Sequence, residues 1–525
     1  MLSAAYKHQV PAVSETFNEG MTAALPPLAT AYDFLKLYIN DDMMRLLVTE
    51  TNRYASQYIE RNVISPHSPV NKWCPTTDDE MYAFIGLALL MGLVYKPRLS
   101  MYWSGDQVFS TPVFGQVMSR DRFLLILRFL HVNDNDLLDV SDPDRDRLHK
   151  IRPFLDLLKD NCASVYSPGR DLCIDESLVL FKGRLAFKQF IRTKRARFGI
   201  KLFELCTSNG IMLDFLVYHG KVHTELWNIP GHNFLFSEQV PLTLMSRYLD
   251  RGHRLFLDNY YTSPVLAQYL LDQGTKLVGT VRATRQNFPA ELSNASLEKG
   301  QSQFAAAHTG MLAVKYRAST DKANKKPKVV YLLSTDHENR CVQTAKTDKD
   351  GAPIMKPHCV TDYNKNMGGV DLQDQQLESV MAIRKTFKWY KKLLFRFILQ
   401  SALSAHKLSQ RGDKKKDFLH FLHECITHMI SKAPRFTTAA SAGVDSVARL
   451  TGREHFPCKR EYDGKGKKRS SKKKECRVCR ARGIRTPKGG PVETTWVCES
   501  CPSVPGLCVD RSCFRDYHVM FDYSN

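Results

Sequence analysis

The sequence predicts an α/β protein that is flanked by helical regions and followed by a cysteine-rich domain with metal-ligand spacing. Three observations carry this prediction. Apolar residues recur three and four apart from about residue 30 to residue 169, which is the period of amphipathic helices. At Asp171 the pattern changes to the short apolar or alternating runs that are typical of strands. Seven of the 14 cysteines lie from Cys458 onward, so they are concentrated at one end.

Length, charge and apolar content narrow the classes of protein that this chain resembles. At 525 residues it can bury a large core, and roughly two to four domains are expected. Its 75 basic and 54 acidic residues leave a net charge of +21, which favours a polyanionic partner such as nucleic acid. A membrane partner is disfavoured, because the longest apolar run, residues 84–95, has 12 residues and is too short to span a bilayer.

The amino-terminal residues carry no recognisable targeting pattern. Residues 1–20 lack a basic region followed by an apolar core, so we expect no signal peptide and an intracellular, reducing location. Scattered cysteines such as Cys162, Cys206 and Cys425 are then expected to be small core residues and not disulfides. Residues 1–30 contain few large apolar side chains, which predicts a disordered tail.

Helical regions are expected on both sides of the strands. The first covers residues 31–169, in which residues 76–95 place three acidic residues in the first turn of a helix with an apolar body. The second covers residues 384–452. Its helix at 387–410 is expected to turn its apolar residues inward and to leave four cations outward, either solvated or in contact with DNA: Lys391, Lys392, Arg396 and Lys407.

The stretch DLCIDESLVLFKGR, residues 171–184, carries the acidic pair Asp175 and Glu176 within an apolar, extended run. Eight Lys or Arg and no acid follow from Lys182 to Lys201. A carboxylate on a strand beside a dense cationic face suits phosphodiester chemistry, because the carboxylate can hold a metal while the cations hold phosphates. The alternative is a surface strand with ordinary charges.

A second acidic motif lies in a strand–helix–strand unit. Residues 255–258 read as a short buried strand that ends in the carboxylate of Asp258. Ser263 and Pro264 supply a helix cap and a first-turn proline, and Gly274 ends that helix before the next strand. Because ligand sites collect at the carboxyl ends of parallel strands, Asp258 is placed where chemistry is expected.

A third acidic motif contains Asp371 and Asp374, which are three residues apart and share one face of a helix. The glycines at 368 and 369 would allow a close approach near the start of that helix. Residues 285–356 lie between the second and third motifs and are rich in Ala, Ser, Lys and Gln. We expect this segment to be an insertion that stands apart from the core sheet.

The carboxyl-terminal part begins with a basic linker, residues 453–475, and continues into a cysteine-rich domain, residues 476–525. Residues 453–488 contain 15 basic and 4 acidic residues, a pattern of nuclear import signals or of flexible phosphate-binding arms.

Paired CxxC motifs separated by 18 residues are a strong zinc signal, and two Zn²⁺ ions are expected. One arrangement places Cys476, Cys479, Cys498 and Cys501 around one ion and Cys508, Cys513 and His518 around a second, completed by His455 or Cys458. An interleaved pairing is equally compatible with the spacing.

The order IDESLVLFKGR, FGIK, FLDNYYTS, MGGVDLQDQ, RKTFKWY and a Cys/His-rich end resembles the piggyBac family of DNA transposases over residues 31–525. The resemblance implies an RNase H-like catalytic core, residues 170–284 and 357–383, interrupted by an insertion domain at 285–356. It also implies helical dimerisation and DNA-binding regions at 31–169 and 384–452, and a zinc domain that binds transposon ends. Family members often carry a longer acidic amino-terminal tail than this chain does.

By motif matching, the family's catalytic aspartates fall on Asp175, Asp258 and Asp371, with Asp374 as an accessory acid. These carboxylates are expected to hold Mg²⁺ or Mn²⁺, since all-carboxylate sites suit hard cations. The residues expected to contact DNA are Lys182, Arg184, Arg192, Lys194, Arg195, Lys201, Arg384, Lys385 and Trp389. The family also implicates the aromatic at Trp389 in a hairpin intermediate.

The resemblance implies a cut-and-paste transposase that works as a homodimer in the nucleus. Its expected substrates are double-stranded DNA carrying transposon terminal inverted repeats and TTAA target sites, and its expected intermediates are DNA hairpins. The main alternative is a domesticated, transposase-derived DNA-binding protein without transposition activity, although the presence of all four acids favours an enzyme. Another alternative is a zinc-domain chromatin-interaction module whose basic tail binds histones or other proteins.

Overall fold

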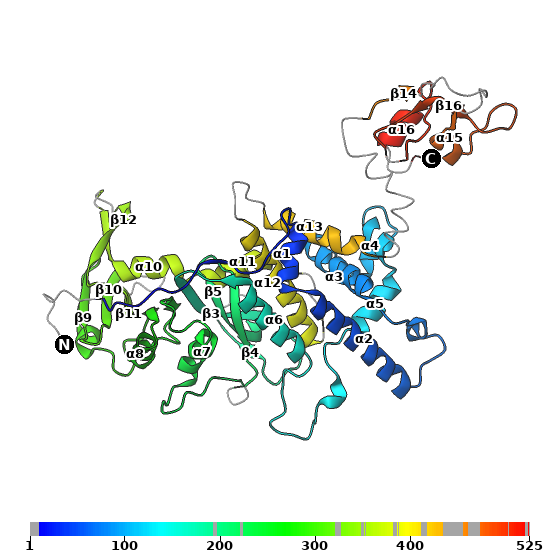
Figure 1. Cartoon of the computed structure of the whole chain (residues 1–525). Helices are drawn as coiled ribbons and strands as arrows, with labels where there is room; N and C mark the ends of the chain where they lie inside the picture. The colour runs from blue at the N-terminus through cyan, green and yellow to red at the C-terminus, as the bar shows by residue number, and fades with distance from the viewer. Residues whose placement is uncertain are drawn as a thin grey trace. The chain divides into compact units, whose positions relative to one another are not determined.

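The structure of the chain is a computed structural model. It describes residues 10–192, 197–220, 224–320, 327–347, 351, 353–381, 386, 388–410, 417–433, 455–459, 473–501, 503–519 and 523. The chain divides into two compact units (Figure 1). The first contains residues 1–110 and 120–430, and the second contains residues 111–119 and 431–525.

The helical part of the first unit has its helices within residues 31–169 where the apolar period predicts them, and two more after the sheet. Its helices begin where the sequence supplies caps: the side chain of Thr30 accepts from the backbone of Asp33, and that of Thr77 accepts from the backbone of Glu80. The helices are α1 (Ala31–Tyr38), α2 (Asp41–Arg61), α3 (Asp78–Leu93), α5 (Arg120–Phe129), α6 (Arg152–Val165), α12 (Trp389–Ser409) and α13 (Phe418–Ser431), with short 3₁₀ turns at Pro69–Lys72, Leu99–Trp103 and Asn135–Leu137.

A mixed sheet of nine strands forms the other part of the first unit, in the order β4-β5-β3-β7-β8-β11-β10-β9 with β6 paired to β5. The central strand β3 is antiparallel to β5 and parallel to β7, and β7 is parallel to β8. The strands are β3 (Asp171–Leu180), β4 (Gln189–Phe190), β5 (Phe198–Thr207), β6 (Met212–Val217), β7 (Arg254–Leu257), β8 (Lys276–Thr280), β9 (Ser302–Ala306), β10 (Leu312–Thr320) and β11 (Pro327–Ser334).

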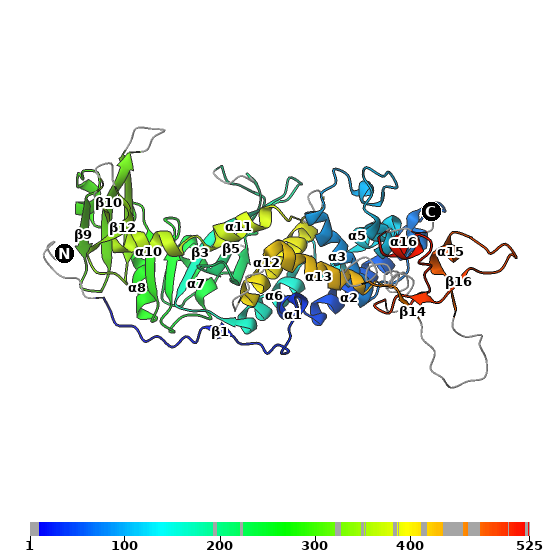
Figure 2. The same ribbon diagram turned by 90° about the horizontal axis from the view of Figure 1, so that it is seen from above.

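Helices cover both faces of this sheet, as in other α/β layers. Figure 1 shows α7 (Phe236–Met245) and α8 (Pro264–Asp272) on one face and α10 (His358–Asn366) and α11 (Gly369–Glu378) on the other. Figure 2, seen from above, shows α10 and α11 in a row over the strands. The short helix α9 (Ala290–Asn294) precedes β9. The chain turns at Gly210, which has a φ of +80°, and the predicted cap at Ser263 is present.

The segment expected to stand apart from the core sheet instead extends it. β11 pairs with β8 in antiparallel register, with Leu332 opposite Thr280 and Ser334 opposite Val278. The edge of β8 would otherwise expose unpaired backbone groups, and the apolar residues of β9–β11 join the same core as those of β7 and β8. A two-stranded hairpin of β12 (Cys341–Thr347) and β13 (Pro353–Pro357) follows.

The expectation of a disordered tail is wrong for residues 10–30. β1 (Gly20–Met21) pairs with β2 (Tyr166–Ser167), and the ring of Phe17 stacks on His253 with centroids 5.2 Å apart. Figure 2 shows this segment running along the first unit towards α1. Few large apolar residues are needed because a short strand pairing and one aromatic contact hold the segment. Residues 1–9 lie outside the described part of the chain.

The second unit contains short elements. Among its described residues, the helices are α4 (Pro112–Val117), α15 (Arg477–Ala481) and α16 (Cys513–Val519). The strands described there pair antiparallel, β14 (Cys458–Lys459) with β17 (Trp496–Val497) and β15 (Lys474–Glu475) with β16 (Glu493–Thr494). Across both units, the described helices include none that is long and apolar enough to cross a bilayer.

Candidate active site and metal centres

Three carboxylates converge where β7 ends beside β3. β7 pairs with β3 only as far as Ile174, so Asp175 and Glu176 extend beyond the last paired residue. Asp258 follows directly after β7, which ends at Leu257. One oxygen from each of Asp175, Glu176 and Asp258 lies within 4.8 Å of the others. We refer to these three side chains as the carboxylate cluster.

The carboxylate cluster has the electrostatics of a cation site. Burial raises the pKa of Asp258 above its usual value, and the charge of Glu176 raises it further. A hydrogen bond of 2.9 Å from the backbone N–H of Tyr260 to Oδ1 of Asp258 opposes this shift and orients the carboxylate. Because three nearby carboxylates repel and offer only oxygen ligands, the residues present fit a hard divalent cation such as Mg²⁺.

The helix that carries Asp371 and Asp374 is held against β3 and β5 by a glycine. A Cβ at Gly369 would lie 2.3 Å from the carbonyl oxygen of Thr207 and 2.7 Å from Sγ of Cys173. A larger residue would push α11 off the sheet, as the glycine pair in the sequence suggested. Asp371 and Asp374 line a groove of about 790 Å³ that also contains Lys182 and Arg197.

Asp374 is engaged by two partners near this groove. Its Oδ1 accepts a hydrogen bond of 2.7 Å from Oγ of Ser177 on β3 and one of 2.6 Å from Nη2 of Arg396 on α12. The carboxylate cluster, as assigned among the described residues, does not include Asp371 or Asp374. The part of these two residues in holding a metal therefore stays a prediction.

Replacing Asp374 with asparagine is expected to lower the free energy of unfolding by about 3 kcal/mol, because it leaves the guanidinium of Arg396 buried without its counter-ion. The side chain of Arg396 is 6% exposed and that of Asp374 is 29% exposed. Urea unfolding measures the change. The double variant Asp374→Leu/Arg396→Met removes both charges and should recover most of the loss, whereas an equal or greater loss in the double variant would contradict the ion-pair explanation.

The cations of α12 do not face outward as expected. Lys391, Lys392 and Arg396 are at most 5% exposed, because α12 runs through the helical core with 18 of its 21 residues buried. Nζ of Lys391 donates to the carbonyl of Arg128 at 3.1 Å, and burial lowers its pKa to about 7. Nζ of Lys407 donates to the carbonyl of Gly210 at 2.9 Å. Lys391 and Lys407 thus satisfy internal acceptors, which the amphipathic pattern did not reveal.

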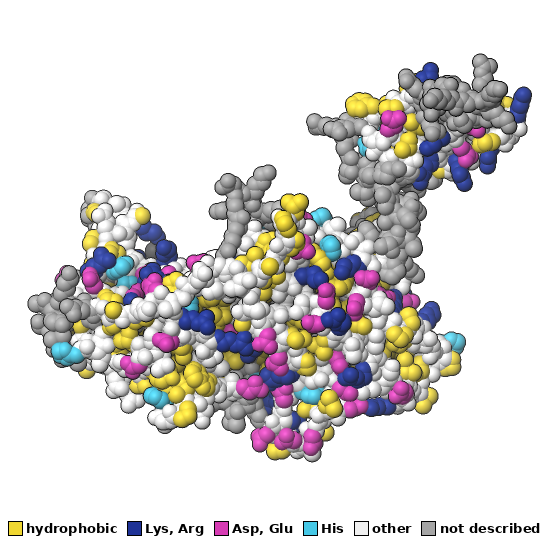
Figure 3. All heavy atoms as spheres, viewed as in Figure 1, with side chains coloured by type: hydrophobic (Ala, Val, Ile, Leu, Met, Phe, Trp, Pro, Cys, Tyr) yellow, Lys and Arg dark blue, Asp and Glu magenta, His cyan; other side chains and the backbone are white. Residues whose placement is uncertain are grey.

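The remaining candidates for DNA contact differ in their placement. Lys182, Arg184 and Arg192 are exposed on the segment after β3, and Lys201 is half-buried on β5. Trp389 begins α12, is half-buried, and meets the ring of Phe187 edge to face at 5.4 Å. Figure 3 shows acidic and basic side chains mixed over the helical part on the face in view. Lys194, Arg195, Arg384 and Lys385 lie outside the described residues.

A further group of acids and a histidine is already occupied by cations of the protein. Asp336 and Asp362 accept from the guanidinium of Arg254, and Asp336 also pairs with Lys276 at 2.8 Å. Nε2 of His337 lies 3.1 Å from Asp362. This ion network joins β7 and β8 to α10 and the turn after β11, so its role is to hold the extended sheet together.

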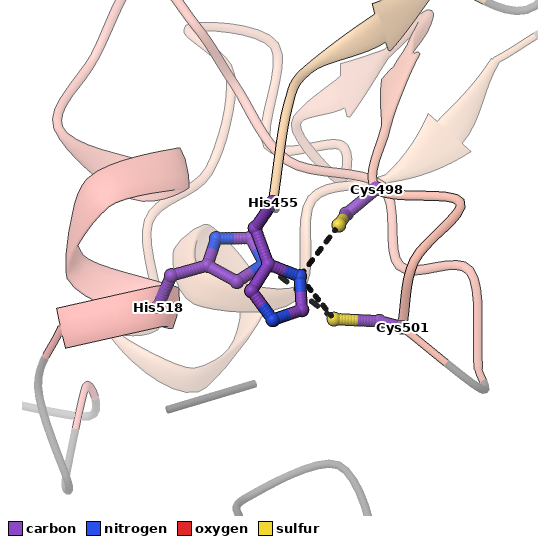
Figure 4. A group of neighbouring side chains, drawn as sticks. All are labelled: His455, Cys498, Cys501 and His518. Atoms are coloured by element: carbon purple, nitrogen blue, oxygen red, sulfur yellow. Dashed lines mark hydrogen bonds between the residues drawn. The ribbon is translucent and has the colours of Figure 1, made fainter. Parts of the chain in front are cut away.

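Two groups of four metal-ligand side chains lie in the second unit. One contains Cys476, Cys479, Cys508 and Cys513, all buried, and the other contains His455, Cys498, Cys501 and His518. The four ligand atoms of each group lie within 4.8 Å of one another. Figure 4 shows the two imidazoles of the second group stacked on each other, with Cys498 and Cys501 on one side of them.

The distances within these groups suit thiolate and imidazole ligands of one ion. Nδ1 of His455 lies 3.3 Å from Sγ of Cys498, and Nε2 of His518 lies 3.5 Å from Sγ of Cys501. Nδ1 of His518 lies 2.7 Å from the carbonyl oxygen of Phe514, which leaves Nε2 directed at the group. Four such ligands fit tetrahedral Zn²⁺. Of the pairings that the spacing allows, the structure has the interleaved one, with His455 and not Cys458 as the eighth residue.

Sequence reasoning missed two contributors to the site. Glu176 belongs to the carboxylate cluster, and the acidic pair in the strand was the available signal. Arg396 pairs with Asp374 from 22 positions away, and it was taken for a surface cation. Only the packing of α12 against α11 shows that these two charges meet.

Two family models match the chain. One, described as Transposase IS4, matches residues 30–404, and the other, described as DDE_Tnp_1-like zinc finger, matches residues 461–519. The human PiggyBac transposable element-derived protein 3 is 25% identical over 505 residues, covering 94% of this chain and 77% of that protein. The human PiggyBac transposable element-derived protein 2 is 26% identical over 399 residues, covering 74% of this chain and 63% of that protein.

A solved structure is similar over nearly the whole chain. It is the piggyBac transposase synaptic complex with hairpin DNA, which is 25% identical to this chain with a TM-score of 0.69. The similarity covers 94% of this chain and 98% of the other.

Proposed function

Since the chain belongs to the piggyBac family of DNA transposases, we propose that it is an active transposase that cleaves DNA at transposon ends and joins them to target DNA. The observation that carries the proposal is the convergence of Asp175 and Asp258 from adjacent parallel strands. Two acids brought together beside an exposed cationic segment match the demands of phosphodiester cleavage.

The chain's own residues would prepare the reaction. Asp175 and Asp258, with Asp371, would hold Mg²⁺ or Mn²⁺, and the ion would supply activation of the attacking oxygen and stabilisation of the leaving 3′ oxygen. The backbone of Tyr260 fixes the orientation of Asp258, and the pair of Ser177 and Arg396 fixes Asp374 beside the groove. No covalent protein nucleophile is required.

The finer course of the reaction is proposed from the family resemblance. Water nicks the transposon end, and the freed 3′-OH attacks the opposite strand to form a hairpin. After the hairpin opens, the 3′-OH joins target DNA at TTAA. Lys182, Arg184, Arg192 and Lys201 would hold phosphates along this path.

The second unit would bind the transposon ends. We propose that its two groups of ligands hold two Zn²⁺ ions and that the basic residues of 453–475 contact the DNA backbone. We further propose that the enzyme acts as a homodimer in the nucleus. The solved relative is a synaptic complex with hairpin DNA, which supports a DNA partner.

An excision assay tests the proposed function. The purified chain is incubated with Mg²⁺ and a plasmid that carries the element's own ends, and the expected products are an excised element and a plasmid backbone with TTAA ends. A domesticated DNA-binding protein would bind the ends and yield no excision. A chromatin-interaction module would bind histone peptides through its second unit more tightly than duplex DNA.

The variant Trp389→Ala is expected to keep first-strand nicking and to lose hairpin formation or resolution. Trp389 is half-buried and its edge-to-face pair with Phe187 is worth about 1 kcal/mol, so the variant should remain folded. The exposed part of the indole can stack on an unpaired base among neighbouring cations. Denaturing gels resolve the nicked and hairpin products. Destabilisation by about 3–5 kcal/mol with equal loss of every step would instead assign Trp389 to the core.

A further inference from the structure

An aromatic pocket lies on the face of the sheet that α7 covers. It has a volume of about 390 Å³, and its lining includes Phe203, Tyr218, Phe236 and Tyr260. The rings of Phe203, Tyr218 and Phe236 lie 6.0–6.3 Å apart, two of the three pairs edge to face. Gln189, Lys201 and Ser237 add polar groups. We call this the aromatic pocket. Its size and its few polar groups are those of a site for a flat organic ligand.

The aromatic pocket adjoins the carboxylate cluster. Phe203 on β5 lies directly opposite Glu176 on β3, so the two side chains share one face of the sheet. Tyr260 is two residues after Asp258 and donates its backbone N–H to that carboxylate. A group in the pocket would therefore lie next to the reacting phosphate.

The two faces of β3 differ in what they offer to a DNA strand. Asp175 and Ser177 alternate with Glu176, and Ser177 contacts α11 on the side of the groove that Lys182 and Arg197 line. The aromatic pocket lies on the side of Glu176. A strand whose phosphate sits at the carboxylate cluster has a cationic groove on one side and aromatic walls on the other.

Lys201 belongs to the wall of the aromatic pocket. Its Nζ lies 4.6 Å from the ring centroid of Phe203 and 5.0 Å from that of Tyr260. A cation placed between aromatic rings and the carboxylate cluster is suited to a ligand that combines an anionic phosphate with a flat base.

We propose that the aromatic pocket receives one unstacked nucleobase of the DNA strand whose phosphate lies at the carboxylate cluster. The proposal rests on the proposed transposase function and specifies how that site recognises its substrate. A base held between aromatic rings is taken out of the duplex stack, which draws the strand towards the acids. Gln189 and Ser237 offer hydrogen-bonding groups to the base edge, and Lys201 faces its phosphate.

Abasic hairpins test the proposal. The probe is a hairpin oligonucleotide closed by a TTAA loop, together with four versions that each lack one loop base, in buffer with Ca²⁺ in place of Mg²⁺ so that binding is measured without cleavage. Wild-type protein should bind one abasic version about 10-fold more weakly than the complete hairpin. The variant Phe236→Ala should bind the complete hairpin about 10-fold more weakly and show no further loss with that abasic version.

Two further variants serve as controls for this test. Phe236→Leu keeps apolar volume without the ring, so it decides the outcome if the melting temperature of Phe236→Ala falls. Tyr269→Ala removes a half-buried aromatic that packs on His232 and Phe234 in a separate hollow, and it should bind every probe as the wild type does.

The outcomes distinguish failure of the base-binding inference from failure of the proposed transposase function. If the Phe236 variants lose the same factor in affinity with every abasic probe, the aromatic pocket holds no base. This result would overturn the inference and leave the proposed transposase function standing. If the wild-type protein does not prefer the TTAA hairpin to the same stem with a scrambled loop, the hairpin step of the proposed function fails and this inference fails with it.

Discussion

Replacing Asp258 with asparagine is expected to abolish DNA strand cleavage and to leave DNA binding near the wild-type level. Asparagine keeps the side-chain volume, but it removes one of three carboxylates that lie within 4.8 Å of one another. Losing a metal-holding charge should raise the barrier by roughly 4 kcal/mol, which lowers the cleavage rate about 10³-fold. Cleavage of a labelled transposon-end duplex in Mg²⁺ and a mobility-shift assay measure the two properties separately.

Matched variants define what this result means. Asp175→Asn should lose cleavage to the same extent, and Glu176→Gln should lose part of it, because Glu176 contributes charge to the same cluster. Asp272→Asn is the control. This exposed carboxylate on α8 accepts a hydrogen bond of 2.8 Å from Gln268 and does not belong to the carboxylate cluster. Wild-type cleavage by Asp258→Asn would remove Asp258 from the site.

Pairs of cysteine variants are expected to release one or two zinc ions according to the grouping in the second unit. Cys476→Ala and Cys513→Ala should each reduce bound zinc from about two ions to about one per chain, and so should their double variant, because both residues belong to one group. Cys476→Ala/Cys498→Ala should lose both ions, because these residues belong to different groups. Elemental analysis of purified protein gives the stoichiometry.

The loss should be local to the second unit. Structural zinc supplies roughly 10–16 kcal/mol to a small domain, so the zinc-free unit should unfold while the first unit keeps its thermal transition. Cys458→Ala is the control and should retain both ions, since Cys458 lies outside both groups. Deleting residues 453–525 should weaken binding to transposon ends and spare the first unit. Intact protein without zinc, or loss of a single ion in Cys476→Ala/Cys498→Ala, would contradict the grouping.

Features that depend on neighbouring residues could be read from the sequence alone. The cap at Ser263 marks a real helix start, because a capping side chain bonds to a backbone N–H only two or three residues away. The strand that leads into Asp258 was likewise visible in a short window, although it ends at Leu257. The order of the acidic motifs and the spacing of the cysteines identified the family before any contact was known.

Features that depend on which distant segments meet were decided only by the tertiary structure. The sequence permitted several cysteine pairings, and the fold of the second unit brings Cys476 and Cys479 to Cys508 and Cys513. The pair of Asp374 and the buried Arg396 could also be found only in the tertiary structure. From sequence alone, a cation on a helix is predicted to be exposed. Metal-ligand geometry decides the first case, and the cost of burying a charge decides the second. Both act between residues that are far apart in the sequence, so no local pattern shows them.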